Sequence, residues 1–455
     1  MNDKNFLRTF YRFAAITLIL AFALVLLSGC ADNSAGSAPA QTEPASTDAP
    51  VQTALGPAEN PDEAKAIELA EQYGIDEADL LGEYSLFVKY CEAVGNNDRL
   101  SGFESYVYAL FPVIARNVYF LDEAYFFDKL SRLRIDAVTL PEGYAGEYVD
   151  DVTTAYFDES TRGQHPWEAA ALFHELMHFI DCTLNGKPET AYAAGGRVIA
   201  ASELGTLSDA ERSAAFMLDD AYVISESGAE LFAAKYFTGA PVSYSKGVAF
   251  LTGIEYIFGS ETLEDLFFYS DSSVRFANLF LDEGYTLDEY IALNLTLSWH
   301  TYPGSFNVPQ PLVPLEDVLI DLYRKHKGED WLADAEFTYI LKSINGVALS
   351  DYEASAYADA LREIEFTSIG EFSVFMAEIT DRLGLRFSFY MAPPIPFIRD
   401  GSFLIGSPAD WEDPDTGEQR TGNFILEIKP DTYFIPWYEL SDGAEYASAA
   451  PDAND

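Results

Sequence analysis

Basic residues are scarce in this chain, and their scarcity excludes one class of partner. The 455 residues include 27 lysines and arginines against 74 acidic residues, which gives a formal net charge of −47. A surface this acidic repels polyanions, so nucleic acid is disfavoured as a partner. The acidic residues are spread along the chain and form no single tail. This spread favours a solvated surface that keeps a secreted protein soluble, with a basic or cation-bridged substrate as the alternative.

Cysteine and histidine are also rare. Of the three cysteines, Cys30 belongs to the N-terminal segment, whereas Cys91 and Cys182 could pair outside the cell or remain two buried thiols. Hydrophobic residues, in contrast, make up 49% of the chain and include 33 Phe and 28 Tyr, enough for large cores. This composition excludes a disordered protein, and the length predicts two folded parts. We find no internal repeat.

The first thirty residues have the features of a targeting signal. Lys4, Arg8 and Arg12 precede an apolar run over residues 13–27, which is short for a membrane-spanning helix but suits a signal peptide. The run ends in Leu-Ser-Gly-Cys at residues 27–30, which resembles the bacterial lipobox. That resemblance implies cleavage before Cys30 and lipid attachment to it, so we expect a membrane anchor. An uncleaved or ordinary signal is the alternative. Residues 31–60 are rich in Ala, Ser, Pro and Thr, which is typical of a flexible tether.

The pattern after residue 60 is mostly helical. A helix is predicted to begin at Pro61, and a second helical block covers residues 103–133, with a break at Pro112. Strands are expected at 134–140 and 152–158, and a long helix from Pro166. Helices should then dominate to about residue 299.

The C-terminal part changes character after a Pro-rich segment at 303–314. Two or three helices are expected to about residue 383, followed by β structure. Apolar runs at 403–405 and 424–428 flank an Asp-Pro-Asp-Thr-Gly stretch at 413–417. That stretch resembles a calcium loop but lacks the downstream Glu of an EF-hand, so a hairpin turn is favoured.

One motif carries specific chemistry. His174-Glu175-Leu176-Met177-His178 matches the His-Glu-x-x-His pattern, within a stretch from Trp167 to Ile180 that has no Gly or Pro. On a helix, residues i and i+4 share a face, so both imidazoles can bind one zinc ion. Glu175 lies beside that face and can take a proton from a water that zinc activates. Two histidines without a metal are the alternative.

Zinc needs a further protein ligand, and we assign it to Glu226. Glu226 and Glu230 share a face of a predicted helix over residues 218–237, and acids facing a core are costly unless they are paired or bind metal. Glu230 is then expected to accept a hydrogen bond from a ligand histidine and so to support it. The alternatives are the reverse assignment, an acidic solvent face, and Asp181 as ligand, although Asp181 is better placed as a supporting residue. The metzincin pattern is excluded because it would need Gly and His where Asp181 and Leu184 stand.

This constellation resembles the gluzincin metallopeptidases, in which His-Glu-x-x-His is completed by a Glu from a later helix, often as Glu-x-x-Ala-Glu. Residues 226–230 have that form. The 48 positions from His178 to Glu226 are closer to the anthrax lethal factor type than to the thermolysin type. The continuation Phe179-Ile180-Asp181 is similar to that type as well. The resemblance covers about residues 135–300 and implies a zincin-like core. It also implies substrate binding along an edge strand upstream of the active helix, a place that residues 152–158 would take.

The resemblance has one gap, the group that stabilises the oxyanion. Asp219 stands where the lethal factor type has a tyrosine, so His300, Tyr302 and Tyr222 are the candidates. For His300, a structural role is the stronger reading.

The sequence therefore predicts a predominantly helical α+β protein with four segments. These are a lipoprotein signal peptide at 1–29, a tether at 30–60, a zincin-like domain with a helical N-terminal part at 61–302, and a mixed α+β module at 303–455. The expected function is zinc-dependent cleavage of a peptide or protein substrate at the outside of a bacterial cell membrane. A noncatalytic surface lipoprotein that uses the fold for binding or adhesion is the rival.

Overall fold

The structure is a computed structural model, and it divides the chain into two compact units, Met1–Asn60 and Pro61–Asp455. The described residues all belong to the second unit. They are 62–100, 102–141, 144–164, 167–184, 186–218, 221–241, 243–301, 311–345, 356–357, 387–389, 395–412, 417–427 and 438–441. The segments predicted as signal peptide and tether, with Cys30, lie outside them.

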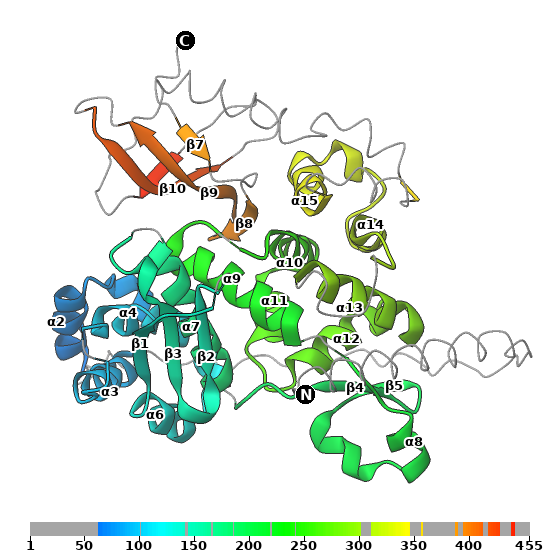
Figure 1. Cartoon of the computed structure of the whole chain (residues 1–455), viewed down its shortest axis with the longest axis horizontal. Helices are drawn as coiled ribbons and strands as arrows, with labels where there is room; N and C mark the ends of the chain where they lie inside the picture. Colours follow the sequence, from blue (N-terminus) through cyan, green and yellow to red (C-terminus); the bar gives the residue numbers. More distant parts are fainter. Residues whose placement is uncertain are drawn as a thin grey trace, which may run out of the picture. The chain divides into compact units, whose positions relative to one another are not determined.

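The described unit is a mixed α+β structure with mostly helical content, as the sequence predicts (Figure 1). Its N-terminal part is a group of short helices: α2 (Glu63–Tyr73), α3 (Tyr84–Gly95), α4 (Glu104–Tyr108), α5 (Phe111–Arg116) and α6 (Glu123–Leu130). The predicted helix start near residue 61 is confirmed by α2. The predicted break at Pro112 is confirmed, because α4 ends at Tyr108 and Pro112 lies in the first turn of α5, where a missing N–H costs nothing.

A three-stranded sheet follows: β1 (Arg134–Val138), β2 (Gly146–Val149) and β3 (Thr154–Asp158), in the order β1-β3-β2. β1 and β3 are parallel, and β2 is antiparallel to β3. The prediction that residues 152–158 form the edge strand is therefore wrong, because β3 is paired on both sides. The two edge strands are β1 and β2, and the four residues of β2 are too few, and include a Gly and a Glu, to show a strand pattern.

Helix α7 (Trp167–Leu184) packs against β2 and β3 and confirms the predicted long helix. Fourteen of its 18 residues are buried. A helix that is apolar on all sides, as this one nearly is, belongs in an interior. The polar side chains on it are therefore held inside the protein and need partners there.

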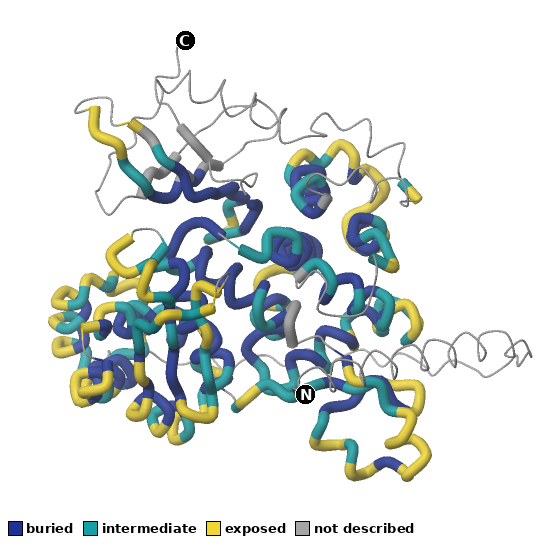
Figure 2. The backbone as a smooth tube through the Cα atoms, in the orientation of Figure 1, coloured by how far each residue is buried: buried dark blue, intermediate teal, exposed yellow. Residues whose placement is uncertain are grey.

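A second small sheet was not predicted. It contains β4 (Ala191–Ala194), β5 (Arg197–Ala200) and β6 (Phe216–Met217), with α8 (Asp209–Ser213) between the last two. Gly195 and Gly196 join β4 and β5 with φ of 59° and 76°, values that a two-residue hairpin turn requires and that glycine adopts without strain. The Gly-Gly pair was the signal for a hairpin in a region that we expected to be helical. Figure 2 shows exposed backbone around α8.

The helices expected up to residue 299 are present. A continuous helical segment contains the π-helical turn η6 (Ala221–Ser227), α9 (Gly228–Ala233) and the π-helical turn η7 (Ala234–Thr238). The helices after it are α10 (Ser245–Phe258), α11 (Ser260–Phe267), α12 (Ser272–Asp282), α13 (Leu287–Thr301), α14 (Leu315–His326) and α15 (Ala335–Asn345). α10 is central, and it packs against α9, α11, α13, α14 and α15. None of the helices in the described ranges is both long and apolar enough to cross a membrane.

The last sheet confirms the predicted change to β structure. It contains β7 (Phe387–Phe389), β8 (Ile395–Arg399), β9 (Ser402–Glu412), β10 (Gln419–Glu427) and β11 (Tyr438–Ser441). β9 and β10 form an antiparallel hairpin, as expected, and residues 413–416 at its tip lie outside the described residues. The sheet packs on α10 through β8, where the Thr252 hydroxyl donates to the carbonyl oxygen of Pro396 at 2.9 Å. The chain before and after residue 303 is thus joined by direct contacts.

Candidate metal centre

Helix α7 brings its two motif histidines together in the interior. His174 and His178 are separated by one turn and are 7% and 8% exposed. Their Nε2 atoms lie 3.1 Å apart. Two imidazole lone pairs at this distance repel each other unless a proton or a cation lies between them.

Glu226 completes the group from the π-helical turn η6. Its Oε2 atom lies 3.3 Å from His174 Nε2 and 3.6 Å from His178 Nε2. These three residues form the only group of three or more potential metal ligands within the described ranges. π-helical turns are frequent at functional sites, because the wider turn redirects a side chain.

The spacing of the three atoms fits a zinc ion. Ligand atoms at about 2.0–2.1 Å from a tetrahedral ion lie about 3.3 Å from one another. The observed separations of 3.1, 3.3 and 3.6 Å bracket this value. Two imidazole nitrogens and one carboxylate oxygen are also a donor set that zinc prefers, and they leave a fourth position for water or substrate.

The other ring nitrogens of both histidines have partners. His174 Nδ1 lies 3.0 Å from Glu230 Oε2, which confirms the predicted contact between Glu230 and a histidine of the motif. His178 Nδ1 lies 3.2 Å from the Ser225 hydroxyl. When each Nδ1 carries the proton and donates it outward, each Nε2 keeps a lone pair for a metal. The contacts therefore hold both rings in the orientation that a metal site needs.

The side chain of Glu175 extends from α7 to the edge strand β2. It is 5% exposed, and the backbone N–H of Tyr148 on β2 donates to its carboxylate. Gly146 lies so close to it that a Cβ at this position would stand 2.3 Å from Glu175 Oε1. The absent side chain of Gly146 thus makes the room that the Glu175 carboxylate occupies.

The charges of the site act on one another. Burial lowers the pKa of His174, but hydrogen bonds with Glu226 and Glu230 outweigh it and raise the pKa well above the usual 6.5. Burial also opposes ionisation of Glu226, yet its hydrogen bonds to both histidines hold its pKa below the usual range. Burial raises the pKa of Glu175. A buried carboxyl with a raised pKa is a stronger base than one in water, which suits proton transfer.

Asp181 does not take the supporting role that we expected. It is 2% exposed, its Oδ1 has no hydrogen-bond partner among the described residues, and burial raises its pKa well above the usual 3.8. The Nδ1 atoms of both histidines are already bonded to Glu230 and Ser225. Asp181 is also absent from the group of potential ligands. It is one helical turn too far along α7, so it lies in the core beyond the site.

The oxyanion candidates are only partly described. Tyr302 and the side chains of Asp219 and Tyr222 lie outside the described residues. His300, near the end of α13, is half-buried, and burial together with the charge of Lys246 lowers its pKa to about 3. His300 is therefore neutral at pH 7 and can donate one N–H. Its ring packs edge-on against Trp299, which supports the structural reading.

Several residues of the site were missed from the sequence. They are Gly146, Tyr148, Ser225, Ser243 and Tyr244. The Ser243 hydroxyl and N–H both donate to Glu230, and the Tyr244 ring stacks on His174 with ring centroids 5.6 Å apart. Only Ser225, beside Glu226, could have been suspected from its position. The others come from segments whose approach to α7 has no sequence signature.

Two other features are separate from this centre. Cys91 and Cys182 are both unpaired, so of the two alternatives the free thiols are correct.

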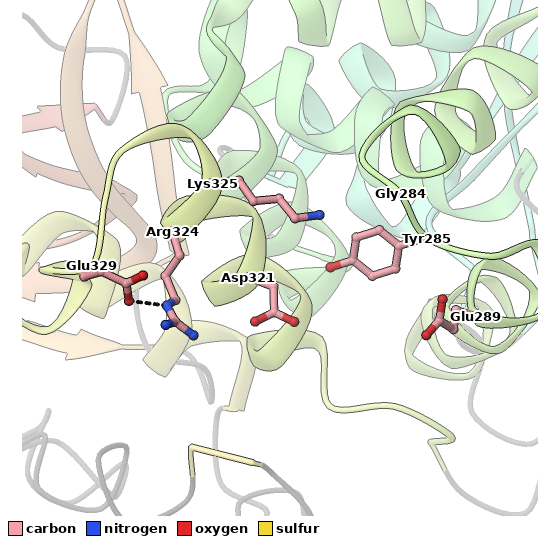
Figure 3. A pocket seen from close by; sticks show the side chains of 7 residues that line it. All are labelled: Gly284, Tyr285, Glu289, Asp321, Arg324, Lys325 and Glu329. Carbon is pink, nitrogen blue, oxygen red and sulfur yellow. Dashed lines mark hydrogen bonds and ion pairs between the residues drawn. The ribbon is translucent and has the colours of Figure 1, made fainter. Parts of the chain in front are cut away.

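An open pocket of about 400 Å³ lies between α13 and α14, where Tyr285 and Asp321 face one another and Arg324 pairs with Glu329 (Figure 3). Its charged side chains are of both signs, and none of the residues of the metal centre lines it.

Comparisons with known proteins identify no relative of this chain. A scan against protein-family models and searches of curated proteins and of solved structures found no match to this chain. The function therefore has to be argued from the site itself.

Proposed function

We propose that this protein is a zinc-dependent endopeptidase that acts on a peptide or protein substrate outside a bacterial cell. The observation that carries the proposal is the convergence of His174, His178 and Glu226 at 3.1–3.6 Å, with Glu175 buried beside them. His-Glu-x-x-His on one helix, with a Glu from a later helical segment, is the ligand arrangement of the gluzincins, which these residues resemble. A zincin-like core is the corresponding proposal for the fold.

The antiparallel edge strand supports the same proposal. β2 pairs with β3 on one side, packs against α7 and has no partner strand on its other side among the described residues. The free edge can bind an extended peptide by main-chain hydrogen bonds, which is how a protease reads a backbone without regard to side chains. Such a peptide would pass beside Glu175, whose carboxylate accepts from the β2 backbone at Tyr148.

The chemistry then divides between the metal and the chain. Bound zinc would supply a Lewis acid that polarises the scissile carbonyl and lowers the pKa of a water molecule. Glu175 takes a proton from the attacking water on its carboxylate and passes it to the leaving nitrogen. His174, His178 and Glu226 hold the ion, while Glu230 and Ser225 orient the two imidazoles.

The proposed location follows from the lipobox. Lipid on Cys30 would hold the enzyme at the outer face of the membrane, with residues 31–60 as a tether. Cleavage at this surface would restrict the enzyme to extracellular peptides or proteins. The strongly negative charge of the chain disfavours nucleic acid as a ligand, because like charges repel.

The test compares three variants of the full-length protein. Glu175→Gln should keep zinc but lose nearly all turnover of a broad peptide library, because an amide cannot accept the proton. Glu226→Ala should lose most of the bound zinc while the chain stays folded. The control Glu71→Gln, at an exposed position of α2, should match the wild type in both measurements. Wild-type turnover in Glu175→Gln would refute the mechanism, and zinc without any peptidase activity in the wild type would favour the binding-module rival.

A further inference from the structure

The turn before α10 touches the metal centre at two places. Ser243 donates to both oxygens of Glu230, from its backbone N–H to Oε1 at 3.0 Å and from its hydroxyl to Oε2 at 2.8 Å. The next residue, Tyr244, stacks its ring against the imidazole of His174, at 5.6 Å between centroids and 24° between planes. Ser243 thus contacts Glu230, and the next residue, Tyr244, contacts the histidine that Glu230 supports.

Tyr244 adopts a backbone conformation that needs a reason. Its φ is 49° and its ψ is 33°, in the left-handed region that bulky side chains rarely adopt. Helix α10 does not require it, because the residue before a helix is usually extended. Backbone strain of this kind persists where surrounding contacts over-determine it, often at functional sites. Here the Tyr244 ring stacks on His174, and the preceding Ser243 bonds Glu230.

Glu230 depends on Ser243 for its own position. The Glu230 side chain is 5% exposed, and its Oε2 atom also lies 3.0 Å from His174 Nδ1. A buried carboxylate that braces an imidazole has to be fixed itself, since otherwise it can rotate away from the ring. Ser243 bonds both oxygens and so fixes the plane of the carboxylate.

We propose that Ser243 and Tyr244 form a positioning turn that holds Glu230 and, through it, presents the Nε2 atom of His174 to the metal. Ser243 orients the carboxylate, and the Tyr244 ring limits the rotation of the imidazole from its face. This inference rests on the proposed zinc function. It assigns the two residues to the stability of the metal site and not to contact with substrate.

The first experiment measures zinc binding by the metal-free, full-length protein in competition with a coloured chelator. Ser243→Ala should weaken zinc binding by about 10- to 100-fold, as for other residues behind a ligand. Tyr244→Gly removes the ring and should weaken it too, although glycine accepts the backbone conformation. Tyr244→Phe keeps the ring and should bind zinc like the wild type. The control Ser343→Ala removes a half-buried hydroxyl that bonds the Tyr339 carbonyl on α15, and it should leave zinc binding unchanged.

The second experiment separates this proposal from the proposed function. With five histidines in the chain, the Nδ1 proton of His174 can be followed by proton NMR in the metal-free protein. The signal should be sharp in the wild type and in Ser343→Ala, and broadened by solvent exchange in Ser243→Ala. If the wild type binds no zinc, the proposed function fails, and this signal still decides the positioning role. A sharp signal and wild-type zinc binding in both Ser243→Ala and Tyr244→Gly would overturn the proposal.

Discussion

Replacing Gly146 by alanine should separate catalysis from metal binding. The added Cβ would stand 2.3 Å from Oε1, 2.6 Å from Cγ and 2.8 Å from Cδ of Glu175. Ordinary van der Waals contacts between such atoms begin at about 3.4 Å. The Glu175 carboxylate therefore has to move by about 1 Å. It cannot move without leaving its bond from the Tyr148 N–H or without displacing β2.

The expected size of the effect follows from that displacement. A catalytic group misplaced by about 1 Å can cost about 100-fold in rate, which corresponds to about 2.7 kcal/mol of transition-state stabilisation. The three atoms nearest to the added Cβ all belong to Glu175, and none belongs to the three proposed ligands. Zinc content should therefore remain at the wild-type level while kcat falls.

The assay pairs zinc content with kcat on the best peptide from a library. Gly205→Ala is a matched control, because a Cβ at Gly205 would meet no atom within 4 Å, and this glycine has no positive φ. It should leave both quantities unchanged. A wild-type kcat in Gly146→Ala would refute the idea that β2 sets the position of the base. Loss of zinc together with kcat would show that the substitution disturbs the whole site.

Two further predictions concern a buried acid and the lipid anchor. Because burial raises the pKa of Asp181, the folded state binds its proton more tightly than the unfolded state, and wild-type stability should fall as the pH rises from the unfolded pKa towards the raised value. In Asp181→Asn this fall in stability should be absent, and zinc should be retained. Denaturant unfolding over a pH series measures the stability. A pH dependence of stability equal to that of the wild type would contradict the prediction. Cys30→Ala should move the protein from the membrane fraction to the medium or block its processing, which fractionation and blotting would show. Unchanged partitioning with normal processing would count against lipid attachment.

Local patterns of the sequence determined the elements that carry the strongest periodicity. An apolar stretch without Gly or Pro predicted α7, and the spacing of His174 and His178 on that helix placed both rings on one face. The i, i+4 relation of Glu226 and Glu230 likewise placed the two acids on one side of their helical segment, and both contact His174, one at each ring nitrogen. These relations depend only on helix geometry, so a sequence can reveal them.

The tertiary structure alone decided which distant segments surround the site. β2 is a four-residue strand without alternation, yet its place at the sheet edge brings Gly146 and Tyr148 to Glu175. Asp181 has the spacing of a supporting residue, but the packing of α7 buries it away from the site, and Ser225 and Glu230 bond the histidines instead. Tyr244 stacks on His174 across 70 positions of chain, in a conformation that no propensity favours. Periodicity reports neighbours on one element, whereas contacts between elements depend on how buried surfaces fit together, which no local pattern contains.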